Sequence, residues 1–359
     1  MNLRKVAELC RHDGPYLSVY LDVSRDTEEA ARAIDARWRA AADRLLDRGA
    51  PQQLLAEVAD RMLALTGVAG SAGRMVVAAR EQILVDEVVP CPEHVGVVDW
   101  GPLPDVTGWL ADIESARSVL LVLADRAGAD LELYDAWPGR PVERRTVQGE
   151  TLHLTKVPAG DWAHKEYQRR TEEVWRGNAR EVAAEVDRQV RSGAQLVAVA
   201  GDVRARTEIE HAVGEATRAH LVELEHGSRA PGSSRESLEK ALRGAVRETI
   251  IQEKLAVIRE LQEHAGRGDR VALGVSDVLD KLVLGQVDRL LVTPSEAAKR
   301  EARPADHPGL PLPSTALATD RLRADLATIC AAAETDAQLV VTGPRTVPGD
   351  GIAALLRWE

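Results

Sequence analysis

The sequence predicts a mixed α/β (α+β) protein of three domains. Its 359 residues exceed the usual length of one domain. Apolar runs of strand length alternate along the chain with longer segments in which apolar residues recur at the helical period. A stretch rich in turn-forming residues, 226–232, interrupts this pattern. We therefore expect an α+β domain over 1–115, an α/β domain over 116–228 and a second α/β domain over 229–359.

Composition excludes several classes of protein. The formal net charge is −11, so the chain as a whole is not a basic protein that coats DNA or RNA, and any RNA contact must come from a local basic patch. The N-terminus lacks the apolar core of a signal peptide, and no apolar run has the length of a membrane span. Cys10, Cys91 and Cys330 lie far apart without CxxC spacing. We expect a cytoplasmic protein without a metal site, a disulfide framework or a cofactor.

The first domain combines strands with two helices. Residues 16–22 alternate in the manner of a strand, and 27–48 have helical periodicity with Trp38 on the apolar side. A second helix ends near residue 65. Residues 73–79 and 82–85 then read as paired strands around a short polar turn.

The second domain opens with a hairpin and contains one long helix. Strands at 119–124 and 129–134 flank a tight turn. The helix, 165–191, has apolar residues at the 3.6 period and ends at Gly193. Further elements are expected as strand 196–200, helix 206–220 and strand 221–225. Residues 200–204, between strand and helix, could hold an anion at a helix N-terminus, but they lack the further glycines of a nucleotide-binding loop, which favours a plain turn.

The third domain begins with a predicted capping box, in which Ser233 and Glu236 start a helix that ends near Gly266. Residues 266–269 form an Arg-Gly-Asp turn before the next strand. Residues 297–316, rich in proline, alanine and charge, read as a mobile loop. The other expected elements are strand 271–274, helix 276–285, strand 289–292, helix 321–333, strand 338–341 and a closing strand within 351–358.

Four stretches carry a resemblance to a known family: LADRAGADLELY (123–134), AGDWAHKEYQRR (159–170), GVSDVLDKLVLGQVDRLLV (274–292) and GIAALLRW (351–358). In this order they resemble the archaeal and eukaryotic class-one release factors and Pelota. The resemblance runs through the family's bacterial branch, which includes mycobacterial dormancy-associated homologues and the hibernation factor Balon. It covers roughly residues 117–358 and is weak before them. It implies a release-factor/Pelota-like fold with a ribosomal-protein-like third domain, and action on the ribosome.

The family's hydrolytic motif is missing at the matching position. Release factors place Gly-Gly-Gln in the peptidyl-transferase centre, where free glycine torsions and a side-chain amide position water and stabilise an oxyanion. The matching residues are Ala159, Gly160 and Asp161. A carboxylate donates no hydrogen bond, and Ala159 resists positive φ. The resemblance therefore implies no catalytic residues, and Gln168 lies too far along the helix to substitute.

Aromatic and cationic side chains nevertheless follow this position. Rings stack on unpaired bases and cations meet phosphates, so the segment suits RNA. The alternative is a solvated helical face held by i,i+4 pairs such as Glu166–Arg170 and Glu172–Arg176. The expected RNA-binding residues are Gly160, Asp161, Trp162, His164, Lys165, Gln168, Arg169, Arg170, Arg176 and Arg180.

Together these features predict a ribosome-binding translation factor without hydrolytic activity. The resemblance implies that it occupies the ribosomal A site during hibernation or stress, in contact with rRNA, with tRNA or a translational GTPase as further partners. The first domain lacks the motifs with which release factors read stop codons. One alternative is a peptidyl-tRNA hydrolase that uses a divergent loop. Another is a stress regulator that never binds the ribosome, for which the acidic charge argues.

Overall fold

The computed structural model describes residues 1–68, 70–137, 140–149, 161–229, 234–348 and 350–358, with the side chains of 161–168 left out. It confirms the predicted mixed α/β class. The helices are α1 Arg4–Cys10, α2 Ala30–Asp47, α3 Gln52–Leu63, α4 Thr107–Ser115, α5 Asp161–Arg191, α6 Val203–Ala212, α7 Glu215–Arg218, α8 Arg235–Arg267, α9 Val275–Val283, α10 Pro294–Ala297 and α11 Ala324–Glu334. The strands are β1 Tyr16–Asp22, β2 Ala72–Ala79, β3 Gln82–Pro90, β4 Val97–Gly101, β5 Arg117–Asp125, β6 Gly128–Trp137, β7 Glu143–Gln148, β8 Leu196–Gly201, β9 Leu221–Glu223, β10 Val271–Leu273, β11 Val287–Val292, β12 Glu301–Ala302, β13 Leu322–Arg323, β14 Gln338–Val341 and β15 Ile352–Leu356.

The chain forms two compact units, and the first of them joins both ends of the sequence. Unit 1 comprises residues 1–115 and 251–359, and unit 2 comprises residues 116–250. The division into three domains, with boundaries after residues 115 and 228, stays a prediction.

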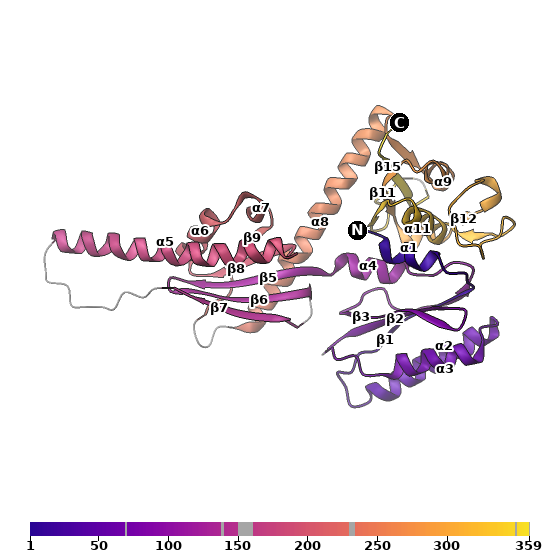
Figure 1. Cartoon of the computed structure of the whole chain (residues 1–359), viewed down its shortest axis with the longest axis horizontal. Coiled ribbons are helices and arrows are strands. Elements are labelled where there is room, and N and C mark those ends of the chain that lie inside the picture. The colour runs from indigo at the N-terminus through magenta and orange to yellow at the C-terminus, as the bar shows by residue number, and fades with distance from the viewer. Residues whose placement is uncertain (69, 138–139, 150–160, 230–233, 349, 359) are drawn as a thin grey trace. The chain divides into compact units, whose positions relative to one another are not determined.

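Unit 1 contains two four-stranded sheets. The first has the order β3-β2-β1-β4 and is antiparallel throughout. Helices α2 and α3 cover one of its faces, where Ile34, Trp38 and Leu54 are buried (Figure 1). The second sheet has the order β10-β15-β11-β14. The C-terminal part of α8 packs against it through Ile258 and Leu261. Each sheet therefore has one face closed by helices of its own sequence neighbourhood.

A shared hydrophobic core joins the two sheets of unit 1. It includes Leu9 of α1 and Leu110 of α4 from the first part of the sequence, and Leu279 of α9 and Ile329 of α11 from the last part. All four side chains are buried. The two ends of the sequence thus depend on each other for burial of their apolar surface.

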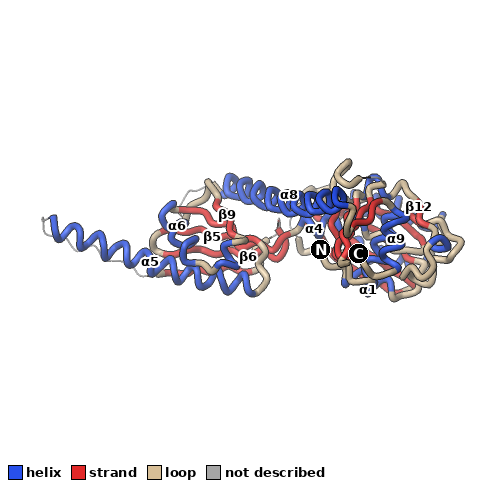
Figure 2. The backbone as a smooth tube through the Cα atoms, turned by 90° about the horizontal axis from the view of Figure 1, so that it is seen from above, coloured by secondary structure: helices blue, strands red, loops and turns tan. Residues whose placement is uncertain are grey.

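Unit 2 is built on a five-stranded sheet of order β7-β6-β5-β8-β9. Strands β5, β8 and β9 are parallel, β6 pairs antiparallel with β5, and β7 pairs antiparallel with β6. Helices α5 and α6 pack on one face, and the N-terminal part of α8 packs on the other through Leu238, Leu242 and Val246 (Figure 2). Two helical layers therefore enclose a mostly apolar sheet.

Several expected elements differ from those observed. The expected helix over 206–220 is wrong as one element: α6 ends at Ala212, and the backbone N–H of Gly214 donates to Asp187 of α5 before α7 begins. Ser234 caps α8 by accepting from the N–H of Ser237, while Ser233 of the predicted capping box lies outside the described residues. The loop 297–316 contains β12 and is anchored by His307, which hydrogen-bonds Asp280 at 2.7 Å.

Candidate functional site

The described side chains of helix α5 change from exposed or half-buried to partly buried along its length. Between residues 169 and 177 no side chain is buried, and Asn178 is the first buried residue among the described side chains of α5. After it, the predicted stripe is confirmed, because Ala179, Val182 and Val186 are buried against the sheet. The first half of α5 extends beyond the end of the sheet (Figure 1). The described side chains of 169–177 therefore face solvent or a partner rather than the protein's own core.

The predicted RNA-binding residues fall into two groups. Gly160 and the side chains of Asp161, Trp162, His164, Lys165 and Gln168 lie outside what the structure describes. The four arginines that follow, Arg169, Arg170, Arg176 and Arg180, are all exposed on α5. The role of all these residues in RNA binding stays a prediction.

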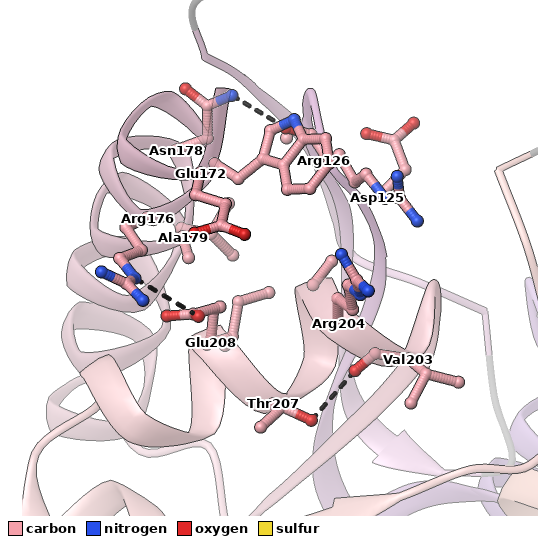
Figure 3. Close-up of a pocket in the computed structure, with 15 residues that line it drawn as sticks. Asp125, Arg126, Glu172, Arg176, Asn178, Ala179, Val203, Arg204, Thr207 and Glu208 are labelled. Carbon is pink, nitrogen blue, oxygen red and sulfur yellow. Dashed lines mark hydrogen bonds and ion pairs between the residues drawn. The ribbon is translucent and has the colours of Figure 1, made fainter. Parts of the chain in front are cut away.

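Three of these arginines recur at the helical spacing that places them on one face: Arg169, Arg176 and Arg180. Within the described part of the chain, Arg169 and Arg180 have no ion-pair partner. Arg176 lies 3.5 Å from Glu208 of α6, in place of the expected pair with Glu172 (Figure 3). The face thus retains positive charge that internal pairs do not neutralise.

A pocket of about 310 Å³ lies beside this face, between α5, α6 and the turn after β5 (Figure 3). We call it the α5–α6 pocket. Its floor is apolar and its rim carries charges of both signs. It is lined by Asp125, Arg126, Gly128, Glu172, Trp175, Arg176, Asn178, Ala179, Val182, Val203, Arg204, Ala205, Thr207, Glu208 and Ile209.

Arg126 forms one wall of the pocket. Its guanidinium carbon lies 4.4 Å from the ring centroid of Trp175, which is a cation–π contact. Its Nε lies 3.2 Å from a carboxylate oxygen of Asp202, and its backbone carbonyl accepts a hydrogen bond from the Asn178 amide at 2.9 Å. Arg126 and Trp175 are therefore held together as a stacked pair.

The start of α6 is a capped turn rather than an anion site. Asp202 accepts from the backbone N–H groups of Arg204 and Ala205, so its own carboxylate occupies the helix N-terminus. The preceding Gly201 has φ of +116°, and a Cβ there would lie 1.9 Å from the Ala124 carbonyl oxygen. The favoured interpretation of 200–204 as a strand–helix turn agrees with this geometry.

Arg229 joins two aspartates of the β5–β6 hairpin, a pairing that the sequence does not indicate. Its guanidinium lies 2.9 Å from Asp125 and 3.0 Å from Asp130. Partial burial would lower the pKa of Arg229, but the hydrogen bond with Asp130 and the charge of Asp125 raise it above the ordinary value. The local sequence suggests only that these aspartates mark turns and a solvated edge. No local pattern predicts the pair, because 104 residues separate Asp125 from Arg229.

The described residues contain no group of three or more His, Cys, Asp or Glu side chains that could hold a metal ion. The same residues include no helix with the length and apolarity needed to cross a membrane.

One segment of the chain matches the model of a known protein family. Residues 118–267 match the model of bacterial archaeo-eukaryotic release factor family 2. This matched segment, which is less than half of the chain, is similar to the bacterial archaeo-eukaryotic release factors. The match covers nearly all of unit 2 and the whole of α8, and so includes the described arginines of α5 and the α5–α6 pocket.

Similar proteins are found over the whole length of the chain. The uncharacterized protein Rv2629 of Mycobacterium tuberculosis strain H37Rv is 29% identical over 371 residues, which cover 100% of this chain and 97% of that protein. Among solved structures, Archaeoglobus fulgidus Pelota is 14% identical, with 95% of each chain covered and a TM-score of 0.35. A model of ribosome-bound archaeal Pelota and ABCE1 is 14% identical, with 99% of this chain and 93% of that chain covered and a TM-score of 0.41.

Proposed function

We propose that this protein is a ribosome-associated translation factor that binds RNA through helix α5 and does not hydrolyse peptidyl-tRNA. The observation that carries the proposal is the projecting half of α5 within the segment that matches the release factor family. Release factors act on the ribosome, whose surface near functional centres is largely RNA. A cytoplasmic location follows from that role.

The charge of α5 supports RNA as the partner of this face. Residues 169–180 contain four arginines and two glutamates in a chain whose overall charge is −11. A basic segment on an acidic protein directs phosphate binding to one place, because the remaining surface repels RNA. The helix N-terminus lies at the same end of α5 and adds a partial positive charge.

Absence of hydrolysis follows from the residues at the position of Gly-Gly-Gln. Asp161, which begins α5, supplies a carboxylate where the family's hydrolytic members supply a neutral amide. A carboxylate accepts hydrogen bonds and repels a developing oxyanion. We further propose that the protein occupies the A site of idle ribosomes in hibernation or stress, alone or with a translational GTPase.

Cosedimentation with purified bacterial ribosomes tests the proposal. The variant Arg169→Glu, Arg176→Glu, Arg180→Glu should lose most binding, because it reverses the charge of the exposed face. The control reverses three exposed arginines of α8, Arg243, Arg247 and Arg259, which have no ion-pair partner among the described residues. Equal binding by both triple variants, with unchanged circular dichroism, would remove α5 from the proposal.

A peptide-release assay tests the second half of the proposal. Ribosomes that carry a labelled peptidyl-tRNA should release no more peptide with stoichiometric protein than with buffer. Rapid release that depends on Asp161 would instead identify a hydrolase.

A further inference from the structure

We propose that the α5–α6 pocket binds a single unpaired RNA base and prefers guanine. The identification of RNA as the ligand rests on the proposed function, but the pocket supplies its own geometric argument. Its volume of about 310 Å³ lies at the lower end of the range for small-ligand sites, about 300–1,000 Å³, and so fits one nucleotide rather than a peptide helix.

The walls of the pocket suit the flat, apolar faces of a base. Ala179, Val182 and Ile209 are buried at its floor. Val203, at the start of α6, lines it while 65% of its surface is exposed. Unpaired bases stack on aromatic rings and on arginine guanidinium planes, and the Arg126–Trp175 pair offers both in one wall.

Most charges around the pocket already have partners. Arg176 pairs with Glu208, Arg126 with Asp202, and Asp125 with Arg229. The opposite charges of each pair cancel and leave little net charge to attract a ligand. They also fix the side chains that form the walls.

Glu172 and Arg204 are the exception. Both side chains are exposed at the pocket, Glu172 on α5 and Arg204 on α6, and neither has a side-chain partner among the described residues (Figure 3). One is an acceptor only and the other a donor only. The matching ligand therefore offers donors at one edge and an acceptor or anion at another, which disfavours a bare phosphate because Glu172 would repel it.

Guanine in RNA meets these requirements. Its N1–H and N2–H groups are adjacent donors that one carboxylate accepts together, whereas adenine and uracil do not offer two adjacent donor atoms at that edge. Arg204 can donate to guanine O6 or to the nucleotide's phosphate. The geometry thus assigns Glu172 to base selection, Arg204 to anion binding, and Arg126 with Trp175 to stacking.

The test measures fluorescence anisotropy of the full-length chain with two labelled single-stranded RNAs, UUGUU and UUAUU. The unmodified protein should bind UUGUU about tenfold more tightly, as expected for one paired donor–acceptor contact. Glu172→Gln should remove most of that preference, whereas Glu173→Gln, on the neighbouring exposed position of α5, should keep it. Arg204→Gln should lower the affinity for both RNAs by about fivefold or more. The control Arg243→Gln, on α8, should lower the affinity for either RNA by less.

Equal affinity for the two RNAs, or identical effects of Glu172→Gln and Glu173→Gln, would overturn the pocket assignment. Binding of UUGUU that survives Trp175→Leu, in a variant with unchanged circular dichroism, would overturn the stacking role. A failure of the pocket assignment can be distinguished from a failure of the proposed function. Ribosome binding without base preference refutes the pocket alone, whereas base preference without ribosome binding refutes the ribosomal role alone.

Discussion

Replacing Arg323 with glutamine should destabilise unit 1 by separating its two halves at a buried charge cluster. Arg323, on β13, forms ion pairs with Asp105 and, at 2.6 Å, with Asp325. Asp105 comes just before α4 and is 5% exposed, while Asp325 lies in the first turn of α11 and is fully buried. The substitution would leave two carboxylates in the interior without their cation.

The size of the effect follows from the burial of the three side chains. Removing one partner of a fully buried ion pair costs about 3–5 kcal/mol. The Arg323 side chain is 41% exposed, so water screens its charge. We therefore expect the substitution to lower the free energy of unfolding by about 2–3 kcal/mol. For a unit of this size, that corresponds to a fall in Tm of about 5–10 °C.

The effect should also depend on pH. Burial raises the pKa of Asp105 above its usual range, and the charge of Arg323 offsets this only in part. Because the pKa of Asp105 is higher in the folded than in the unfolded state, its contribution to the stability of the folded protein is most favourable at low pH. That contribution disappears as pH rises through the folded-state pKa. Without Arg323 the pKa of Asp105 rises further. The deficit of Arg323→Gln should therefore be smaller at about pH 5 than at about pH 8.

Urea unfolding followed by the fluorescence of the tryptophans, which include the buried Trp109 of unit 1, measures the destabilisation at both pH values. The control is Arg321→Gln, which breaks an exposed pair with Glu301 at 3.3 Å and should cost about 0–1 kcal/mol. Equal destabilisation by the two variants, or a deficit that grows on acidification, would refute the reasoning.

Two further stability predictions concern unit 2. Gly201→Ala should lower the free energy of unfolding by more than about 2 kcal/mol, because a Cβ would lie 1.9 Å from the Ala124 carbonyl oxygen at a φ of +116°. Thermal unfolding measures this loss, and an unchanged Tm would contradict the described turn. Leu242→Ala should lower the free energy of unfolding by about 2–5 kcal/mol, because Leu242 is fully buried between α8 and the sheet. The exposed control Arg243→Gln should change it by less than about 0.5 kcal/mol, and similar effects of the two substitutions would mean that α8 packs differently.

The sequence predicted those elements whose signal is local. The apolar stripe of α5 from Ala179 to Val186 and the hairpin of β5 and β6 follow from periodicity and turn residues alone. Short elements such as α1 and β4 were missed because they contain too few residues to show a period. Helix α1 depends instead on burial of Leu9 in the core it shares with α11.

The features that could not be predicted depend on interactions between residues far apart in the sequence. Arg323 and Asp105 are 218 positions apart, so no window of sequence shows their pair. The α5–α6 pocket is formed by α5, α6 and the turn after β5, which meet only in the folded sheet. The arginines of α5 were identified from the family resemblance together with their spacing. The exposure of these arginines, which gives them access to a partner, appears only in the structure.

The affinity of the purified protein for bacterial ribosomes, measured across a series of salt concentrations, tests the central claim most directly. The account predicts that the logarithm of the binding constant falls linearly with the logarithm of salt concentration, because arginines that bind phosphates release counterions. The Arg169→Glu, Arg176→Glu, Arg180→Glu variant should bind more weakly, with a slope smaller by about 0.7–0.9 for each phosphate that the protein no longer neutralises. An absence of binding at low salt, or binding of the same affinity and slope in that variant, would contradict it.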